Sequence, residues 1–132
     1  MTVTERLLKY VSFDTQSDEN SETCPSSAKQ KLLGAALVEE MKALGIANVR
    51  MDENGYVYGE VAGAERAPKI GLIAHMDTSP DASGTNVKPQ IVKYEGGDVL
   101  LNAEKHIVLS PAEFPALKDC IGKKLVVTDG TT

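Results

Sequence analysis

The sequence contains no tryptophan and few other aromatic residues, with two phenylalanines and four tyrosines among 132 residues. A core must therefore be built mainly from aliphatic side chains. Basic residues are also in the minority, since the formal net charge is −5, and no basic stripe with interleaved aromatics appears. This balance argues against a nucleic-acid-binding surface. With 42% hydrophobic and 25% charged residues, the composition is that of one ordinary globular domain, not of a disordered chain.

Cysteines and long apolar runs are scarce as well. Cys24 and Cys120 lie far apart, without a Cys-x-x-Cys pair or zinc-finger spacing, which favours two reduced thiols in a cytosolic protein. The longest apolar stretch, Ile70 to Ala74, is far too short to span a bilayer. No apolar run of the signal-peptide kind follows Met1. We therefore expect a cytoplasmic protein with no membrane partner and no nucleic-acid partner.

Two helices are predicted in the first third of the chain. Thr2 and Glu5 have the spacing of a capping box, which predicts a short amphipathic helix. A longer helix is predicted to begin near Ser27, or one residue earlier, with Gln30 as the capping-box partner of Ser27. Gly45 fits a left-handed C-cap at its end. The apolar stripe of this second helix consists of Leu33, Leu37, Met41 and Leu44.

Strand patterns follow these helices. The segments 49–52 and 56–61 alternate in polarity around the turn residues Glu53-Asn54-Gly55, which predicts a hairpin. Lys69 to Ala74 is almost wholly apolar and has the length of a strand covered on both faces. A helix, a hairpin and a buried strand in this order predict an α/β fold, part of a sandwich of helices and sheet.

The later part of the chain, 78–124, is broken up by proline and glycine, so no long helix is expected there. Gly96-Gly97 is predicted to turn a hairpin between Ile91–Tyr94 and Asp98–Leu101. A last strand is predicted from Lys124 to Thr128.

The residues with chemical potential lie at the end of the predicted buried strand. In extended backbone, residues two apart point to the same side, so His75 and Asp77 face together while Met76 turns away. A histidine that binds a metal is commonly oriented by a carboxylate on its other ring nitrogen, and open α/β sheets bind ligands beyond the carboxyl ends of their strands. On this spacing alone, a histidine at a strand end is more often a surface or packing residue than a metal ligand.

A longer series of matches is more specific than this pair. Gly71-Leu-Ile-Ala-His-Met-Asp-Thr-Ser-Pro-Asp81 and the segment 86–91 resemble the peptidase T family, tripeptide aminopeptidases among the zinc-dependent M20-type metallopeptidases. The resemblance continues in the same order along essentially the whole chain. Its further segments are Leu8–Ser12, Asp14–Ser17, Asp52–Tyr56, Tyr94–Asp98, Leu109–Pro111, Phe114-Pro115 and Thr128–Thr132.

The resemblance implies that residues 1–132 are the N-terminal portion of a zinc-peptidase catalytic domain, a partial αβα sandwich. It implies two Zn²⁺ ions per complete active site, with His75 as the first histidine ligand and Asp77 as the aspartate that steadies its ring. In such enzymes zinc and a glutamate base activate a water molecule that attacks the peptide carbonyl. The implied substrates are short peptides, tripeptides above all, and the complete protein would be a homodimer.

The resemblance also implies what is missing. The bridging aspartate, the catalytic glutamate, the remaining ligands and the dimerisation domain would follow the segment 128–132. His106 matches no ligand position, and Asp129 would precede the bridging aspartate, in a turn after the last strand. We therefore expect this chain alone to be nearly inactive, and to self-associate through a truncated sheet edge at Lys124–Thr128 or a neighbouring strand.

Two other functions are compatible with the sequence. One is a non-catalytic α/β module that serves binding or assembly. The other, which is weaker, is a metallophosphoesterase with His75, Asp77 and Asp81 as ligands. That class needs several further His, Asp or Asn ligands, and only His106 remains.

Overall fold

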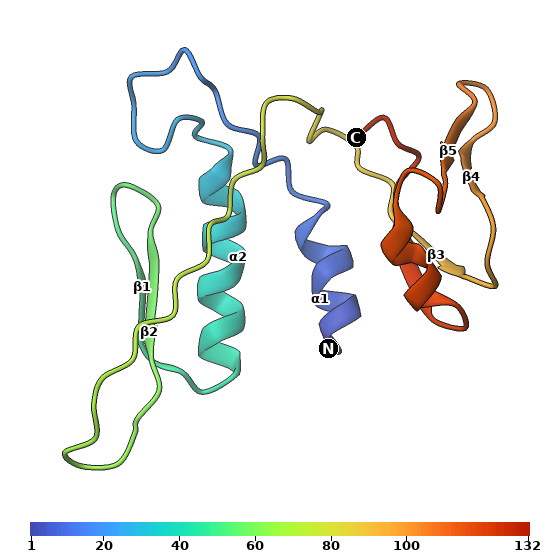
Figure 1. Cartoon of the computed structure of the whole chain (residues 1–132). Coiled ribbons are helices and arrows are strands. Elements are labelled where there is room, and N and C mark those ends of the chain that lie inside the picture. The colour runs from blue at the N-terminus through green and yellow to red at the C-terminus, as the bar shows by residue number, and fades with distance from the viewer. The chain divides into compact units, whose positions relative to one another are not determined.

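The computed structural model describes all residues from Met1 to Thr132, and the chain divides into two compact units. The hairpin unit comprises residues 13–81, and the split unit comprises residues 1–12 together with 82–132. In chain order the elements are α1 (Val3–Tyr10), α2 (Gln30–Ala43), β1 (Ala47–Met51), β2 (Val57–Glu60), β3 (Gln90–Lys93), β4 (Val99–Asn102), β5 (Ile107–Leu109), the 3₁₀ helix η1 (Pro115–Cys120) and β6 (Lys124–Val127) (Figure 1).

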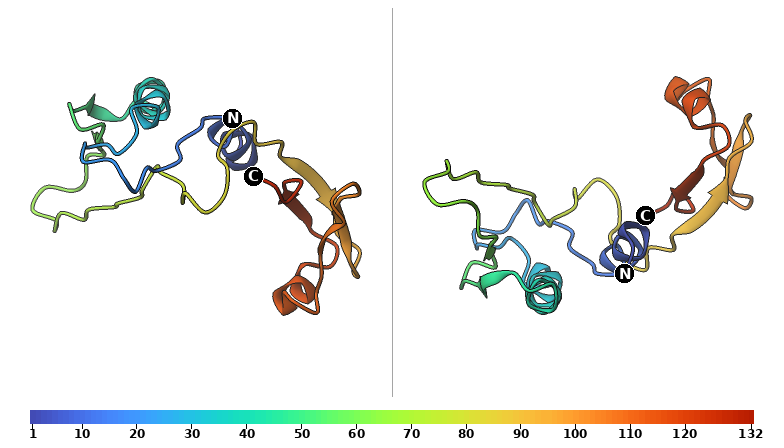
Figure 2. Two further views of the ribbon diagram at one scale, coloured as in Figure 1. Left: turned by 90° about the horizontal axis from the view of Figure 1, so that it is seen from above. Right: turned by 90° about the horizontal axis from the view of Figure 1, so that it is seen from below.

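In the hairpin unit, α2 packs along the antiparallel pair β1–β2 (Figures 1 and 2). Leu33 is the buried apolar side chain of this unit, with 6% of its surface exposed. Gly34 lets the helix approach the strand closely, because a Cβ at this position would lie 2.7 Å from the Met51 sulfur. Across the hairpin, the Arg50 guanidinium lies 4.2 Å from the centre of the Tyr58 ring.

The helix ends follow the sequence in part. The capping box of α1 is confirmed, since the Glu5 amide donates to Thr2 Oγ1 and the Thr2 amide donates to Glu5 Oε2. The capping box predicted for α2 is wrong. That helix begins at Gln30, and its N-cap Lys29 makes no side-chain capping bond. The side-chain amide of Gln30 instead donates to the hydroxyl oxygens of Ser17 and Ser26.

The C-terminal end of α2 is as predicted. Gly45 adopts a positive φ of 76°, its amide donates to the Lys42 carbonyl, and the Ile46 amide donates to the Met41 carbonyl. These are the two bonds of a Schellman motif. The predicted apolar stripe is wrong at its last residue, since Leu44 is 57% exposed. Leu44 is the C-cap residue, where the chain already leaves the helix.

The β1–β2 hairpin is confirmed, with Met51 opposite Val57. Asp52 builds its turn, because one carboxylate oxygen accepts the amides of Asn54 and Tyr56. Gly55 supplies the positive φ of 86° that this turn requires.

The predicted buried strand at 69–74 is wrong for this structure. No strand forms there (Figures 1 and 2). Ile70, Leu72 and Ile73 are 85%, 94% and 99% exposed. The physical reason is pairing. A strand is held by backbone hydrogen bonds to a neighbour, and none of the three sheets includes this segment.

The predicted hairpin around Gly96-Gly97 is also wrong. β3 pairs with β6, and β4 pairs with β5, both antiparallel, so the glycines connect strands of two different sheets. Tyr94 fixes this connection: it is 2% exposed, and its hydroxyl donates to the Gly97 carbonyl at 2.9 Å. The last strand is confirmed at Lys124–Val127.

The mixed α/β character is confirmed, but the sheets are three short antiparallel pairs, not one layered sheet. The absence of a long helix in 78–124 is confirmed, since η1 is the longest helical element there. None of the helices combines the length and apolar character required to cross a membrane.

The burial of α2 makes a testable prediction. Leu33→Ala should lower the free energy of unfolding by about 2–5 kcal/mol, because it removes a buried side chain from the helix–hairpin contact. Leu44→Ala, at the C-cap of the same helix, is the matched control and should cost less than about 1 kcal/mol, because Leu44 is exposed. Urea unfolding followed by circular dichroism measures both. Equal losses would contradict the packing described here.

Candidate functional site at His75 and Asp77

His75 and Asp77 meet as the sequence predicts. The distance between His75 Nδ1 and Asp77 Oδ1 is 3.0 Å, and Met76 between them is half-buried. The contact between residues two apart, expected of extended backbone, therefore forms here, although the segment is not part of a sheet.

The geometry determines which ring nitrogen is available. An ionised carboxylate only accepts hydrogen bonds, so the proton of this contact belongs to His75 Nδ1. The lone pair of neutral His75 is then on Nε2, and the side chain is 85% exposed. One accessible nitrogen, with the other held by a carboxylate, is the arrangement of a histidine that binds zinc. The pair fits zinc as a single ligand with its orienting partner.

Ser17 holds the other oxygen of the same carboxylate. Its hydroxyl donates to Asp77 Oδ2 at 2.6 Å. The pKa of Asp77 lies below its ordinary value, chiefly because of this bond from Ser17 and secondly because of the bond from His75. Each carboxylate oxygen thus has one donor, and the carboxylate is favoured over the acid.

A short parallel bridge brings these residues together. The Thr78 amide donates to the Thr15 carbonyl at 3.2 Å, and the Ser17 amide donates to the Thr78 carbonyl at 3.0 Å. Thr15, whose carbonyl accepts the first of these bonds, is buried, with 3% of its surface exposed. Sequence reasoning missed Ser17, because its partner Asp77 lies 60 residues further along the chain.

Gln30 links this arrangement to the start of α2. Its side chain is buried, and Nε2 lies 3.3 Å from Ser26 Oγ and 3.5 Å from Ser17 Oγ. Ser26 Oγ in turn accepts the Asp18 amide. The residue that spacing predicted to cap the helix therefore connects the helix to the site.

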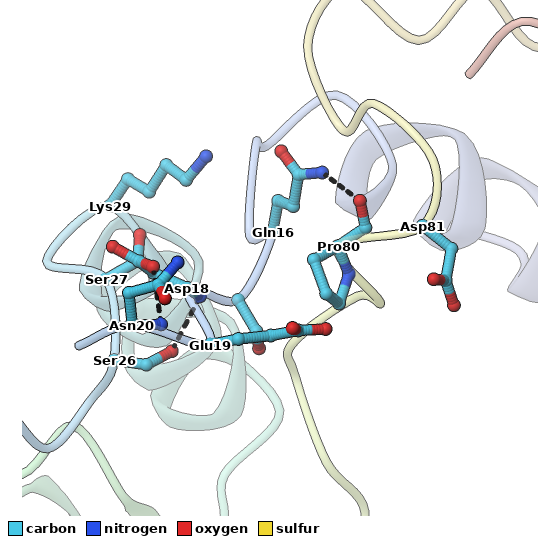
Figure 3. A pocket seen from close by; sticks show the side chains of 10 residues that line it. Gln16, Asp18, Glu19, Asn20, Ser26, Ser27, Lys29, Pro80 and Asp81 are labelled. Atoms are coloured by element: carbon cyan, nitrogen blue, oxygen red, sulfur yellow. Dashed lines mark hydrogen bonds between the residues drawn. The ribbon is translucent and has the colours of Figure 1, made fainter. Parts of the chain in front are cut away.

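Two hollows adjoin the site, and Ser17 lines both. A groove of about 360 Å³ runs past His75 and Asp77 and has a mainly apolar lining that includes Tyr56. A second, polar hollow of about 680 Å³ lies beside Pro80 (Figure 3). The side-chain amide of Gln16 donates to the Pro80 carbonyl at 3.1 Å, and both residues line this hollow.

The other candidate residues do not join this pair. No group of three or more His, Cys, Asp or Glu side chains in the chain comes close enough to hold a metal ion. His75, Asp77 and Asp81 therefore do not form the ligand set of a metallophosphoesterase, and Asp81 accepts the Ser79 hydroxyl instead.

The remaining candidates from the sequence are His106, Asp129 and the two cysteines. His106 is exposed in the turn between β4 and β5 of the split unit. Asp129, also in the split unit, accepts the Thr131 amide and hydroxyl, as expected of a residue in a turn after the last strand. Cys24 and Cys120 are free thiols, as predicted.

Comparison with known proteins supports the resemblance stated above. The chain is 56% identical over 133 residues to the peptidase T of Clostridium acetobutylicum, which covers 98% of this chain and 33% of that protein. It is 58% identical to the peptidase T of Desulfitobacterium hafniense (99% of this chain, 32% of that protein) and 50% identical to that of Parabacteroides distasonis (100% and 33%). No protein-family model matches. The chain is thus similar to peptidase T along its whole length, and it spans about a third of the length of these relatives.

Proposed function

We propose that this chain, which resembles peptidase T from end to end, is part of a zinc-dependent tripeptide aminopeptidase. The complete protein would release the N-terminal residue of short peptides, with tripeptides as its main substrates. The observation that supports this most is the His75–Asp77 contact of 3.0 Å within a chain of this similarity. The similarity to peptidase T supports the proposed class of protein, and the contact supports the proposed role of His75 as a single metal ligand.

Each residue of the pair has a distinct role in this proposal. His75 would be a metal ligand through Nε2, and Asp77 would keep the proton on Nδ1 and the ring in one orientation. Zinc, when bound, would polarise the peptide carbonyl and activate water for hydrolysis. A complete site of this class holds two Zn²⁺ ions, and this chain would supply one ligand.

The same proposal assigns the exposed run at 69–74 a place in the fold. Ile70, Leu72 and Ile73 form an apolar sequence of strand length, yet they are almost fully exposed here. Such a composition suits a strand covered on both faces. We propose that residues 1–132 are a portion of the catalytic domain, and that this run becomes a strand of its αβα sandwich.

Zinc content tests the role of His75. His75→Ala should abolish zinc binding at the first metal position of a full-length protein that contains this chain, because it removes the ligand nitrogen. Asp77→Asn should weaken zinc affinity about 10–100-fold, because the ring loses its orienting carboxylate. Elemental analysis after dialysis against a series of zinc concentrations measures both. His106→Ala is the matched control, and equal zinc in the wild type and in His75→Ala would refute the assignment.

The 132-residue chain alone should have little peptidase activity. A catalytic zinc takes three protein ligands as a rule, whereas one histidine and its orienting aspartate meet here. Incubation with the tripeptide Ala-Ala-Ala and zinc should leave the peptide intact by chromatography. Release of alanine that depends on zinc and disappears in His75→Ala would overturn this expectation, whereas release that persists in that variant would indicate a contaminating peptidase.

The chain alone should also self-associate. The predicted edge strand at Lys124–Thr128 pairs with β3 on one side only, in a two-stranded sheet. The apolar run at 70–73 is the more exposed apolar surface, and we propose it as the main one. Light scattering should detect oligomers that Leu72→Asp reduces, because a charge in the run opposes its burial. Val3→Asp, at a residue that is 81% exposed outside the run, is the control. A monomeric wild type at high concentration would contradict the proposal.

A further inference from the structure

We infer that Ser17 is a positioning residue for the candidate metal site: its hydroxyl holds the Asp77 carboxylate so that His75 presents Nε2 outward. The inference deepens the proposed function and rests on it for the identity of what His75 binds. All the contacts on which it depends are made by residues of this chain.

The direction of every hydrogen bond in the cluster is fixed by chemistry. The Asp77 carboxylate can only accept, so Ser17 must donate its single hydroxyl proton to Oδ2 and His75 must donate from Nδ1 to Oδ1. The Ser17 oxygen then accepts from Gln30 Nε2, at 3.5 Å. No member of this series can reverse its role without losing a bond.

A third group is needed because the pair itself is open to water. The side chains of His75 and Asp77 are 85% and 46% exposed, and a contact between two exposed groups holds their geometry weakly. An aspartate held at one oxygen can still rotate about its last bond. With Ser17 on Oδ2, the plane of the carboxylate is fixed at both ends.

Ser17 is itself well placed to act as this anchor. Its backbone amide donates to the Thr78 carbonyl, next in sequence to Asp77, so its hydroxyl is held in register with the carboxylate. Ser26 is a second hydroxyl that also contacts Gln30, but it accepts the Asp18 amide and has no bond to Asp77. Ser26→Ala therefore disturbs the same loop and spares the carboxylate, which makes it a matched control.

Imidazole ¹⁵N NMR on the 132-residue chain tests the inference without metal or substrate. The spectra are recorded at a pH of about 8.5, above the ordinary pKa of histidine, where the nitrogen shifts report which ring nitrogen is protonated. The chain has two histidines, so His75→Ala assigns both signals and His106 is an internal reference. The wild type should show His75 mainly protonated at Nδ1.

Ser17→Ala should lower the ratio of the Nδ1-protonated to the Nε2-protonated form of His75 by roughly two- to tenfold, the effect of losing one hydrogen bond. Ser17→Thr, which keeps a hydroxyl, should restore the ratio, and Ser26→Ala should leave it unchanged. In an Asp77→Asn background, Ser17→Ala should add nothing further, because the group through which Ser17 acts is gone. The His106 signals should stay constant in every variant.

An unchanged His75 ratio in Ser17→Ala, or an equal change in Ser26→Ala, would overturn the inference. If Ser17→Ala alters the fold and moves the His106 signals, Ser17→Thr is the deciding variant: a His75 ratio that falls in Ser17→Thr as it does in Asp77→Asn is the contrary result. Failure of the proposed function is distinguishable, because it appears as zinc retention in His75→Ala and leaves the metal-free tautomer ratios unaffected.

Discussion

The site depends on one backbone constraint, the parallel bridge that joins residues 15–17 to Thr78. Its two amide–carbonyl bonds connect segments about sixty residues apart and set the register in which Ser17 faces Asp77. Without this bridge, His75 and Asp77 would still be neighbours in sequence, but nothing beyond the pair would hold the carboxylate. The bridge therefore adds Ser17 to the His75–Asp77 pair and orients the Asp77 carboxylate.

The features that sequence predicts correctly are those encoded within a few residues. The capping box of α1, the Schellman motif at Gly45 and the turn at Asp52–Gly55 each depend on side chains or φ angles inside one turn of chain. The His75–Asp77 contact is of the same kind, because alternation along extended backbone fixes it locally. For these elements the sequence and the structure agree in the residues that make each contact.

The features that sequence mispredicts depend on partners far away. Ile91–Tyr94 was expected to pair with the next strand across Gly96-Gly97, but it pairs with β6 near the end of the chain. Lys69–Ala74 has the composition of a buried strand but has no neighbour to pair with. Gln30 fits a local capping pattern, yet its amide contacts Ser17 and Ser26 instead. In each case the outcome depends on whether a partner elsewhere in the chain is present, which local spacing does not encode.

The exposed apolar run and the candidate ligand belong to one segment, and this links the two halves of the proposal. Ile73 and His75 are separated by a single residue, and both are now in water. A protein layer that covers residues 70–73 would also exclude water from the neighbouring bonds of Ser17, Asp77 and His75. Hydrogen bonds to a charged group strengthen when the surrounding dielectric constant falls. If further protein covers this segment as proposed, the contacts seen here would be the weak, solvent-exposed form of a more rigid arrangement.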